Sequence, residues 1–313
     1  MKRVAEWYAR VSENVARVMV GQQQTVRLLL AGFLSGGHVL LEDVPGTGKT
    51  TMARALAASL GLDFKRIQFT PDLLPSDLTG VNVWRDGDFR FVPGPVFTQV
   101  LLADEINRAT PKTQSALLEA MAEGQVTVDG ETRALAEPFF VLATQNPIEM
   151  DGTFPLPEAQ MDRFLLRLRL GYPGEQQEEE LLLRMRAEHP LDKIEAVSDA
   201  AEARSLQQVI SRVQVNPELA AYVVALVRFS RSDKDVALGA SPRAALGLQR
   251  MAMSLAAIAG RSYVIPDDVK EAAAVVLEHR IILKPEVRLE GSSAAGVVER
   301  ALKSVAVPSE EGV

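Results

Sequence analysis

One short segment, residues 43–50, constrains the fold of this 313-residue chain more than any other. It contains two glycines followed by a lysine and a threonine. The apolar run before it, residues 38–42, is typical of a buried strand, and the alanine-rich residues 49–60, closed by Gly61, are typical of a helix. A strand, a glycine-containing turn and a helix in this order predict a βα unit whose turn can surround a phosphate group.

The segment follows the phosphate-loop pattern G-x-x-x-x-G-K-[ST], except that Asp43 stands in place of the first glycine. Glycines let backbone N–H groups curl around phosphate oxygens, and the helix N-terminus contributes its dipole. In this interpretation Lys49 reaches the β- and γ-phosphates and the Thr50 hydroxyl binds Mg²⁺. The alternative, a turn without a ligand, fits the strand–loop–helix context less well. We therefore expect the nucleotide to contact Pro45, Gly46, Thr47, Gly48, Lys49, Thr50 and Thr51.

Two carboxylates, Asp104 and Glu105, follow the apolar run at residues 100–103. By itself such a pair is as consistent with a solvated helix start as with a catalytic site. Downstream of a phosphate loop, however, it fits the second nucleotide motif, in which Asp104 holds Mg²⁺ through water and Glu105 activates the attacking water. The second carboxylate matters because it distinguishes a hydrolase from a nucleotide switch.

A third strand-like run, residues 139–143, leads into Asn146 and a proline. The Asn-Pro pair alone is only a turn signal. If this strand lies beside the other two, Asn146 can orient the attacking water against the γ-phosphate. From the three motifs we predict catalytic roles for Lys49, Glu105 and Asn146, and metal-binding roles for Thr50 and Asp104.

Further strand-like runs at residues 64–69 and 165–170, with a helical stretch at residues 111–123, extend the alternation of strands and helices. This alternation predicts a P-loop α/β fold with a mostly parallel sheet. Two Asp-Gly pairs, at residues 86–87 and 129–130, lie between strand-like runs and predict β-hairpins, because both turn positions need positive φ. The two hairpins interrupt the alternation and are interpreted as insertions.

The sequence changes character after residues 171–174. Apolar residues then recur at helical spacing, and no convincing strand follows until residues 281–283. We therefore predict two domains: an α/β nucleotide-binding domain at residues 1–172 and a C-terminal all-helical lid domain at residues 173–313.

Composition excludes several classes of site and partner. The chain has no cysteine, which rules out disulfides and thiol catalysis, and its 3 histidines (His38, His189 and His279) lack ligand-like spacing and are interpreted as surface or core residues. Its 34 basic and 41 acidic residues give a formal charge of −7, so no nucleic-acid partner is expected. The sequence contains neither a membrane-length apolar run nor a signal-peptide pattern, so we expect a cytoplasmic protein with no membrane segment.

In their order, these segments resemble the MoxR family of AAA+ ATPases. The resemblance covers roughly residues 20–289, most of the chain. It implies the wider group that contains magnesium-chelatase ATPase subunits and minichromosome-maintenance helicases, in which one hairpin is inserted within helix 2 and another before the sensor-1 strand. The resemblance rests on residues 20–22 (VGQ), 41–50 (LEDVPGTGKT), 68–77 (QFTPDLLPSD), 102–109 (LADEINRA), 143–147 (ATQNP) and 156–164 (LPEAQMDRF).

The resemblance also implies site residues that the motifs alone do not. Arg163, within the Asp-Arg-Phe of the last segment, matches the arginine finger that reaches the γ-phosphate of the neighbouring subunit. Arg243, at the start of a lid helix, matches sensor 2, acting in its own subunit or in the neighbour's. Val20 and Gly21 match the segment that contacts adenine.

The function that the resemblance implies is Mg²⁺-dependent ATP hydrolysis in a homo-oligomeric ring, a hexamer. Hydrolysis would move the lid and the hairpins against a protein client, in chaperone-like remodelling or maturation of a protein complex, alongside a partner with a von Willebrand factor A domain. Two alternatives stay open. A nucleic-acid motor of the related helicase type is disfavoured by the mixed charges of the hairpins, and a nucleotide-regulated scaffold with little turnover is disfavoured by Glu105 and Arg163.

Overall fold

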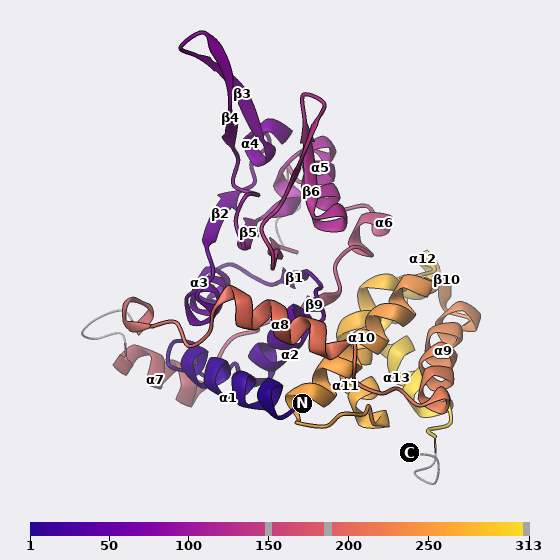
Figure 1. Cartoon of the computed structure of the whole chain (residues 1–313). Coiled ribbons are helices and arrows are strands. Elements are labelled where there is room, and N and C mark those ends of the chain that lie inside the picture. The colour runs from indigo at the N-terminus through magenta and orange to yellow at the C-terminus, as the bar shows by residue number, and fades with distance from the viewer. Residues whose placement is uncertain (148–151, 185–189, 309–313) are drawn as a thin grey trace.

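The computed structural model describes residues 1–147, 152–184 and 190–308, and its centre is a five-stranded sheet (Figure 1). Every neighbouring pair of strands in this sheet is parallel, which confirms the predicted α/β fold. Because the strands are parallel, their carboxyl ends gather at one edge of the sheet and their amino ends at the other. The order across the sheet is β2 (Phe64–Gln68), β5 (Val100–Asp104), β8 (Phe140–Gln145), β1 (Val39–Glu42) and β9 (Leu166–Leu168).

Successive residues of the three central strands, β5, β8 and β1, supply two separate cores, one on each face of the sheet. In β8, Leu142 joins a cluster that includes α2 (Gln23–Leu34) and α3 (Lys49–Leu60). The preceding residue, Val141, belongs to the cluster on the other face, with α5 (Pro111–Glu123). This alternation follows from the two-residue period of a strand, and both faces are covered, as parallel sheets require.

Both predicted hairpins are present and project from the same end of the molecule (Figure 1). The first pairs β3 (Gly80–Arg85) with β4 (Asp88–Pro93), and the second pairs β6 (Gln125–Val128) with β7 (Glu131–Ala134), both antiparallel. The turn residues all have positive φ, as the Asp-Gly signal predicts: Asp86, Gly87, Asp129 and Gly130.

Two side-chain contacts join the second hairpin to the first. The Asn82 side chain on β3 donates to the Asp129 carboxylate (Nδ2 to Oδ2, 2.7 Å). The Arg133 guanidinium on β7 lies 4.0 Å from the centre of the Phe91 ring on β4. Asn82 and Phe91 are paired residues of the first hairpin. Both contacts therefore attach the second hairpin to the same position along the strands of the first.

After β9 the chain forms a predominantly helical lid, as predicted. Its central helix, α10 (Pro242–Ile258), packs on α9 (Pro217–Ser232), α11 (Pro266–Leu277) and α2. The lid differs from the prediction in one feature, a small antiparallel sheet in which the short strands β10 (Val236–Leu238) and β11 (Ile282–Leu283) pair. The run at residues 281–283 noted in the sequence corresponds to β11, whereas β10, with three residues, carries too little periodicity to be recognised. The other α-helices described after β9 are α7 (Glu175–Arg184), α8 (Ala200–Ile210), α12 (Pro285–Leu289) and α13 (Ala294–Ser304), and two short ones, α4 (Pro75–Thr79) and α6 (Glu158–Met161), precede it.

The sequence analysis predicts no helix at the N-terminus, but the structure contains α1 (Lys2–Ala16). Its buried residues include Val4, Trp7 and Val11, at spacings of three and four that amount to a helical signal. The Trp7 indole donates to Ser198 Oγ (Nε1, 2.8 Å), and α1 packs against both α3 and α10. One core cluster therefore runs continuously from the sheet into the lid.

In the described part of the chain no helix is both long and apolar enough to cross a bilayer. Of the three histidines interpreted as surface or core residues, His38 and His279 are buried, and His189 lies outside the described residues.

Candidate active site

The phosphate loop connects β1 to α3 at the carboxyl edge of the sheet. Gly46 and Gly48 have φ of +84° and +89°, in the left-handed region that favours glycine. A Cβ placed on Gly46 would meet no heavy atom within 4 Å, so this side of the loop is open. Because α3 begins at Lys49, its first N–H groups have no partner within the helix. The loop and the helix end therefore present donors and a positive dipole to a phosphate.

The side chain of Lys49 reaches back to the first residues of this loop. Its Nζ donates to the backbone carbonyls of Asp43 (2.7 Å) and Val44 (2.8 Å). Burial lowers the pKa of its ammonium, and the carboxylates of Asp43, Asp104 and Glu105 oppose this shift. The lysine and the acidic pair at the end of β5 thus act electrostatically on one another.

Asp43, the residue that departs from the glycine pattern, fastens the loop to the end of the sheet. Its Oδ1 accepts from the N–H of Val44 (2.8 Å). Its Oδ2 accepts from the N–H groups of Leu170 (2.8 Å) and Gly171 (2.7 Å), which follow β9. A glycine here could not make these bonds, so the aspartate gives this loop a connection to the segment that leads into the lid.

Asp104, the last residue of β5, is held from both sides. Its Oδ1 accepts from Thr144 Oγ1 (2.6 Å) on β8, and its Oδ2 accepts from Arg66 Nη2 (2.6 Å) on β2. These two strands are the neighbours of β5 in the sheet. The position of the carboxylate is therefore set by the order of the strands.

Glu105 has a backbone φ of +55°, which is rare and strained for a residue other than glycine. Its N–H donates to Thr144 Oγ1 (2.8 Å). Its Oε2 accepts from Gln68 Nε2 (2.7 Å) and from Arg108 Nη1 (3.1 Å). The side chain is thus held at the carboxyl edge by donors from two directions.

Asn146 follows β8, the strand that lies between β5 and β1. The residue is buried, and its carbonyl accepts from Asn107 Nδ2 (3.5 Å). This strand order puts Asn146 between the phosphate loop and the acidic pair. The predicted residues that the structure gathers at the carboxyl edge are those of the phosphate loop and the start of α3 (Pro45, Gly46, Thr47, Gly48, Lys49, Thr50 and Thr51), with Asp104, Glu105 and Asn146.

The oxygen groups at this edge fit Mg²⁺ in company with a phosphate ligand. Among the described residues, no group of three or more His, Asp or Glu side chains could hold a metal ion. Thr50, in the first turn of α3, and Asp104 offer one hydroxyl and one carboxylate. Because Mg²⁺ is usually held by one or two carboxylates together with substrate phosphates, this small donor set suits a nucleotide-bound ion.

The segment predicted to contact adenine, Val20 and Gly21, precedes α2. Gly21 has φ of +74°, and a Cβ placed on it would lie 2.2 Å from Cδ of Gln177 in α7. The next residue, Gln22, donates to the carbonyl of Leu170 (Nε2, 3.1 Å). Leu170 is also held by the phosphate loop, so both segments are fastened to the same stretch of chain.

The two predicted arginines lie at the amino edge of the sheet. Arg163 precedes β9, whose first residue, Leu166, pairs with Val39 at the start of β1. Its Nη1 donates to the carbonyl of Leu118 in α5 (2.7 Å). The phosphate loop follows the other end of β1, which has 4 residues and is about 13 Å long at the usual rise of a strand.

Arg163 and Arg243 line one cavity of about 360 Å³, together with Arg250 and Arg280. The cavity lies where the end of α2, the end of α5 and the start of α10 meet. Arg163 and Arg243 are both exposed residues. Within one chain, the structure does not bring either arginine together with Lys49.

Comparison with known proteins identifies the family. Residues 38–166 match the ATPase family associated with various cellular activities (AAA), and residues 228–301 match the AAA lid domain. The chain is 44% identical over 311 residues to the chaperone MoxR1 of Mycobacterium tuberculosis, covering 96% of this chain and 82% of that protein. The chain belongs to the MoxR family of AAA ATPases.

Two further proteins are similar to the chain over most of its length. The chain is 50% identical over 298 residues to YeaC of Bacillus subtilis, covering 95% of this chain and 93% of that one. A crystal structure of a candidate ATPase from Cytophaga hutchinsonii has a TM-score of 0.91 and 40% identity, with 98% of each chain covered. The sheet, loop and lid described above are therefore those of a MoxR-family AAA protein.

The sequence analysis missed three residues that surround the acidic pair of this MoxR-family chain: Arg66, Gln68 and Thr144. Arg66 and Gln68 are two residues apart on β2 and so share a face. Alternating polar side chains at the carboxyl end of a strand could have predicted that Arg66 and Gln68 face the site. No sequence signal marks Thr144, because its role depends on which strand lies beside β8.

Proposed function

We propose that this chain hydrolyses ATP, with Mg²⁺, at sites shared between neighbouring copies in a homo-oligomeric ring, a hexamer. The observation that carries the proposal is the separation of Lys49 and Glu105 from Arg163, which lie at opposite edges of one sheet. An exposed arginine about one strand length from its own phosphate loop is poorly placed to serve that loop. It is well placed to serve the loop of a second copy set edge to edge with the first.

At the carboxyl edge, the loop and Lys49 bind the β- and γ-phosphates. Thr50 and Asp104 would hold Mg²⁺, which when bound neutralises charge on the phosphate oxygens. Asn146 orients a water molecule in line with the γ-phosphorus. As the water oxygen bonds to phosphorus, the bond from phosphorus to the β-phosphate oxygen breaks and Glu105 accepts the water proton. The products are ADP and inorganic phosphate.

At the amino edge, Arg163 completes the site of the neighbouring copy. It supplies positive charge to the transition state, a contribution of ~10³–10⁵ in rate for comparable arginine fingers. We place Arg243 in the same neighbouring site because it shares the cavity of Arg163, and there it would report the nucleotide to the lid. The adenine would contact Val20 and Gly21, since their segment is fastened near the phosphate loop.

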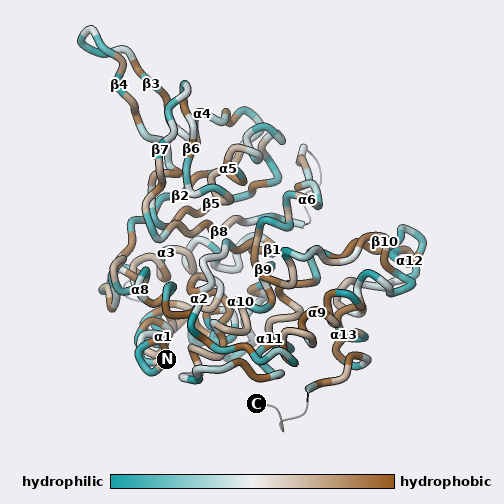
Figure 2. The backbone as a smooth tube through the Cα atoms, turned by 45° about the vertical axis from the view of Figure 1, so that its right-hand side comes forward, coloured by the Kyte–Doolittle hydropathy of each residue, from teal (hydrophilic) through white to brown (hydrophobic). Residues whose placement is uncertain are grey.

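The hairpins would carry the resulting motion to a protein client. Trp84 and Phe89, next to the first turn, are 60% and 64% exposed, with ring centroids 4.9 Å apart. Hydrophobic residues also run along the strands of this hairpin (Figure 2). Its outer part carries two arginines and two aspartates, whose charges cancel, which disfavours a nucleic-acid partner. These features and the name of the chaperone MoxR1 support remodelling of a protein complex. A partner with a von Willebrand factor A domain is part of the proposal through the family resemblance alone.

The proposed domain division is residues 1–172 for nucleotide binding and residues 173–313 for the lid. The bond from Asp43 to the N–H of Gly171 lies beside this boundary. A change at the phosphate loop can therefore reach the start of the lid through a single side chain.

Mixing two impaired variants tests the shared site. Arg163→Ala keeps its own loop and Glu105, whereas Glu105→Gln keeps its finger. In mixed rings an Arg163→Ala subunit next to a Glu105→Gln subunit receives an intact finger, so we expect mixing to restore part of the ATPase activity. If both variants bind ATP and assemble into one ring without any recovery, the shared site is wrong.

A further inference from the structure

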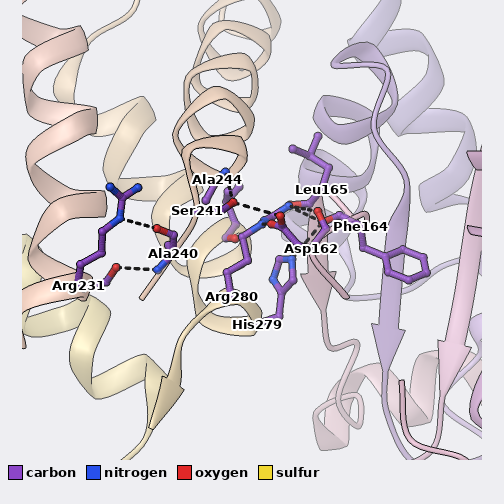
Figure 3. Close-up of polar contacts among 11 residues, drawn as sticks. Asp162, Phe164, Leu165, Arg231, Ala240, Ser241, Ala244, His279 and Arg280 are labelled. Atoms are coloured by element: carbon purple, nitrogen blue, oxygen red, sulfur yellow. Dashed lines mark hydrogen bonds and ion pairs between the residues drawn. The ribbon is translucent and has the colours of Figure 1, made fainter. Parts of the chain in front are cut away.

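A buried arginine joins the lid to the segment that carries Arg163 (Figure 3). Arg280 lies in the short 3₁₀ helix η3 (Glu278–Arg280) after α11, and its side chain is only 3% exposed. Its Nε donates to Asp162 Oδ1 at 2.6 Å. Its two terminal nitrogens donate to the backbone carbonyls of Asp162 (3.2 Å), Phe164 (2.6 Å), Leu165 (3.1 Å) and Val276.

All of these partners except Val276 belong to residues 162–165, and Arg163 is the second residue of that segment. The Arg280 guanidinium therefore holds the backbone on both sides of Arg163. The adjacent His279 adds a contact between its Nε2 and the carbonyl of Phe164 (3.1 Å). The lid thus holds the backbone of Arg163, while the exposed side chain of Arg163 lines the 360 Å³ cavity that it shares with Arg243.

The same network reaches the helix that carries Arg243. Ser241 Oγ donates to Asp162 Oδ2 (3.1 Å) and caps α10 by accepting from the N–H of Ala244 (3.3 Å). Arg243 lies in the first turn of α10. Burial lowers the pKa of Arg280, and the charge of Arg243 adds to that shift while Asp162 opposes it. Asp162 therefore links Arg280 to the start of the helix that bears Arg243.

The contacts of Arg280 differ from those of an arginine that joins two segments of the lid. Burying a guanidinium is costly unless its donors are paired. Within the described lid, the pair of Arg261 and Asp268 (2.6 Å) fastens two neighbouring lid segments, with an arginine that stays 24% exposed. Arg280 differs because it is almost fully buried and because most of its partners flank the arginine of another domain.

We propose that Arg280 is a positioning residue that holds Arg163 and Arg243 as one unit, aimed at the γ-phosphate of the neighbouring subunit. Movement of the lid then moves both arginines together. This inference rests on the proposed ATPase with shared sites.

The test replaces Arg280 with lysine, which keeps the charge but lacks the planar fork that reaches several carbonyls. We expect Arg280→Lys to lower kcat about 100-fold, the scale of a ~1 Å misplacement of a catalytic group, with the Kd for ATP unchanged. The matched control, Arg261→Lys, breaks a comparable arginine–aspartate fork away from residues 162–165 and should keep the wild-type kcat. A wild-type kcat in Arg280→Lys would overturn the inference.

Mixed rings separate positioning from general damage to the fold. Excess Glu105→Gln subunits supply an intact finger to Arg280→Lys subunits, so turnover per Arg280→Lys subunit should recover. Arg163→Ala, mixed in the same way, is the reference. If Arg163→Ala recovers and Arg280→Lys does not, the inference is overturned and the shared site stands. If neither recovers, the shared site itself fails, and the inference fails with it.

Asp162→Asn provides a second variant for the case in which Arg280→Lys does not assemble. Asparagine keeps the shape of the side chain and an oxygen toward Nε, but it removes the charge that pairs with Arg280. We expect a smaller loss of kcat, again restored by Glu105→Gln in mixed rings. A wild-type kcat, or a loss that mixing does not restore when it does restore Arg163→Ala, would overturn the inference.

Discussion

The two edges of the central sheet are built in different ways. At the carboxyl edge, functional groups follow the strand ends directly: Lys49 closes the loop after β1, Asp104 ends β5 and Asn146 follows β8. At the amino edge, Arg163 and Arg243 come from different parts of the chain and are joined through buried polar contacts with the lid. In the proposed mechanism, one chain therefore binds the nucleotide, but the charge that the transition state needs comes from a second chain.

The largest expected effect belongs to the amino edge. Arg163→Ala should lower kcat by about 10³-fold or more, because the transition state loses its external positive charge. The Kd for ATP, measured by titration with a fluorescent analogue, should not change, since Arg163 acts on the transition state and every subunit keeps an intact phosphate loop. Arg204→Ala, which removes an exposed arginine paired with Glu137, is the control. Lost ATP binding in Arg163→Ala would contradict the separation of the two edges.

A somewhat smaller effect is expected at the carboxyl edge. Glu105→Gln should lower kcat by about 10²–10⁴-fold, the usual contribution of a general base, while ATP binding is kept. The amide preserves the shape of the side chain but cannot accept the water proton. Excess Arg163→Ala subunits, which keep Glu105, should not restore turnover at the Glu105→Gln sites themselves. Steady-state turnover close to wild type would show that Glu105 is not the base.

Acid should weaken the amino edge, which contains two buried neutral histidines. His38 bonds through Nε2 to the carbonyl of Met121 (3.0 Å), and its Nδ1 accepts from the N–H of Val141 (3.1 Å). Burial lowers the pKa of His38 to about 4 and the pKa of His279 well below its ordinary value. In the folded chain both imidazoles therefore stay neutral at pH values at which they are protonated in the unfolded chain.

Between about pH 6.5 and about pH 4, the unfolded chain binds more protons than the folded chain. The contribution of these two histidines to the free energy of unfolding is therefore fully present above this range and is lost as the pH falls through it, by about 3 kcal/mol for His38 alone. Urea unfolding at a series of pH values measures the slope, and His38→Gln should flatten it. A stability that does not change over this range would contradict buried, neutral histidines at this edge.

A smaller effect, on the free energy of unfolding, is expected at Asp43, which joins the phosphate loop to residues 170–171. Asp43→Gly restores the usual glycine, yet it should lower the free energy of unfolding by about 1–3 kcal/mol, because the N–H groups of Leu170 and Gly171 lose their acceptor. Glu137→Gln is the control. Its carboxylate pairs with Arg204 (2.7 Å) in an ion pair that is exposed on both sides, so the loss should be about 0–1 kcal/mol. Equal losses in the two variants would show that Asp43 is not a special anchor.

The smallest effect is expected outside both edges. Asn82→Ala removes an exposed hydrogen bond between the hairpins and should change the free energy of unfolding by only about 0.5 kcal/mol. Because neither edge is touched, ATPase activity without a client should stay at the wild-type value. Hydrogen exchange in the first hairpin should become faster. A clear loss of basal ATPase activity would mean that the hairpins belong to the catalytic unit.

Much of the fold could be predicted because its signals are local. The helix at residues 49–60 has the predicted bounds, since Gly61 ends it in a left-handed conformation. The Asp-Gly turns specified both hairpins for the same kind of reason. The missed helix α1 also carried a local signal, but β10 did not, since a three-residue strand has almost no periodicity.

Contiguous residues were enough to predict the phosphate loop, the acidic pair and the alternation of strands and helices. Each of these features depends on neighbours along the chain. The partners of those groups were decided by strand order and lid packing. Thr144 meets Asp104 across 40 positions of sequence, and Arg280 meets Asp162 across 118. A pattern along the chain cannot predict such pairs, because they form only where burial brings distant segments together and forces their polar groups to pair.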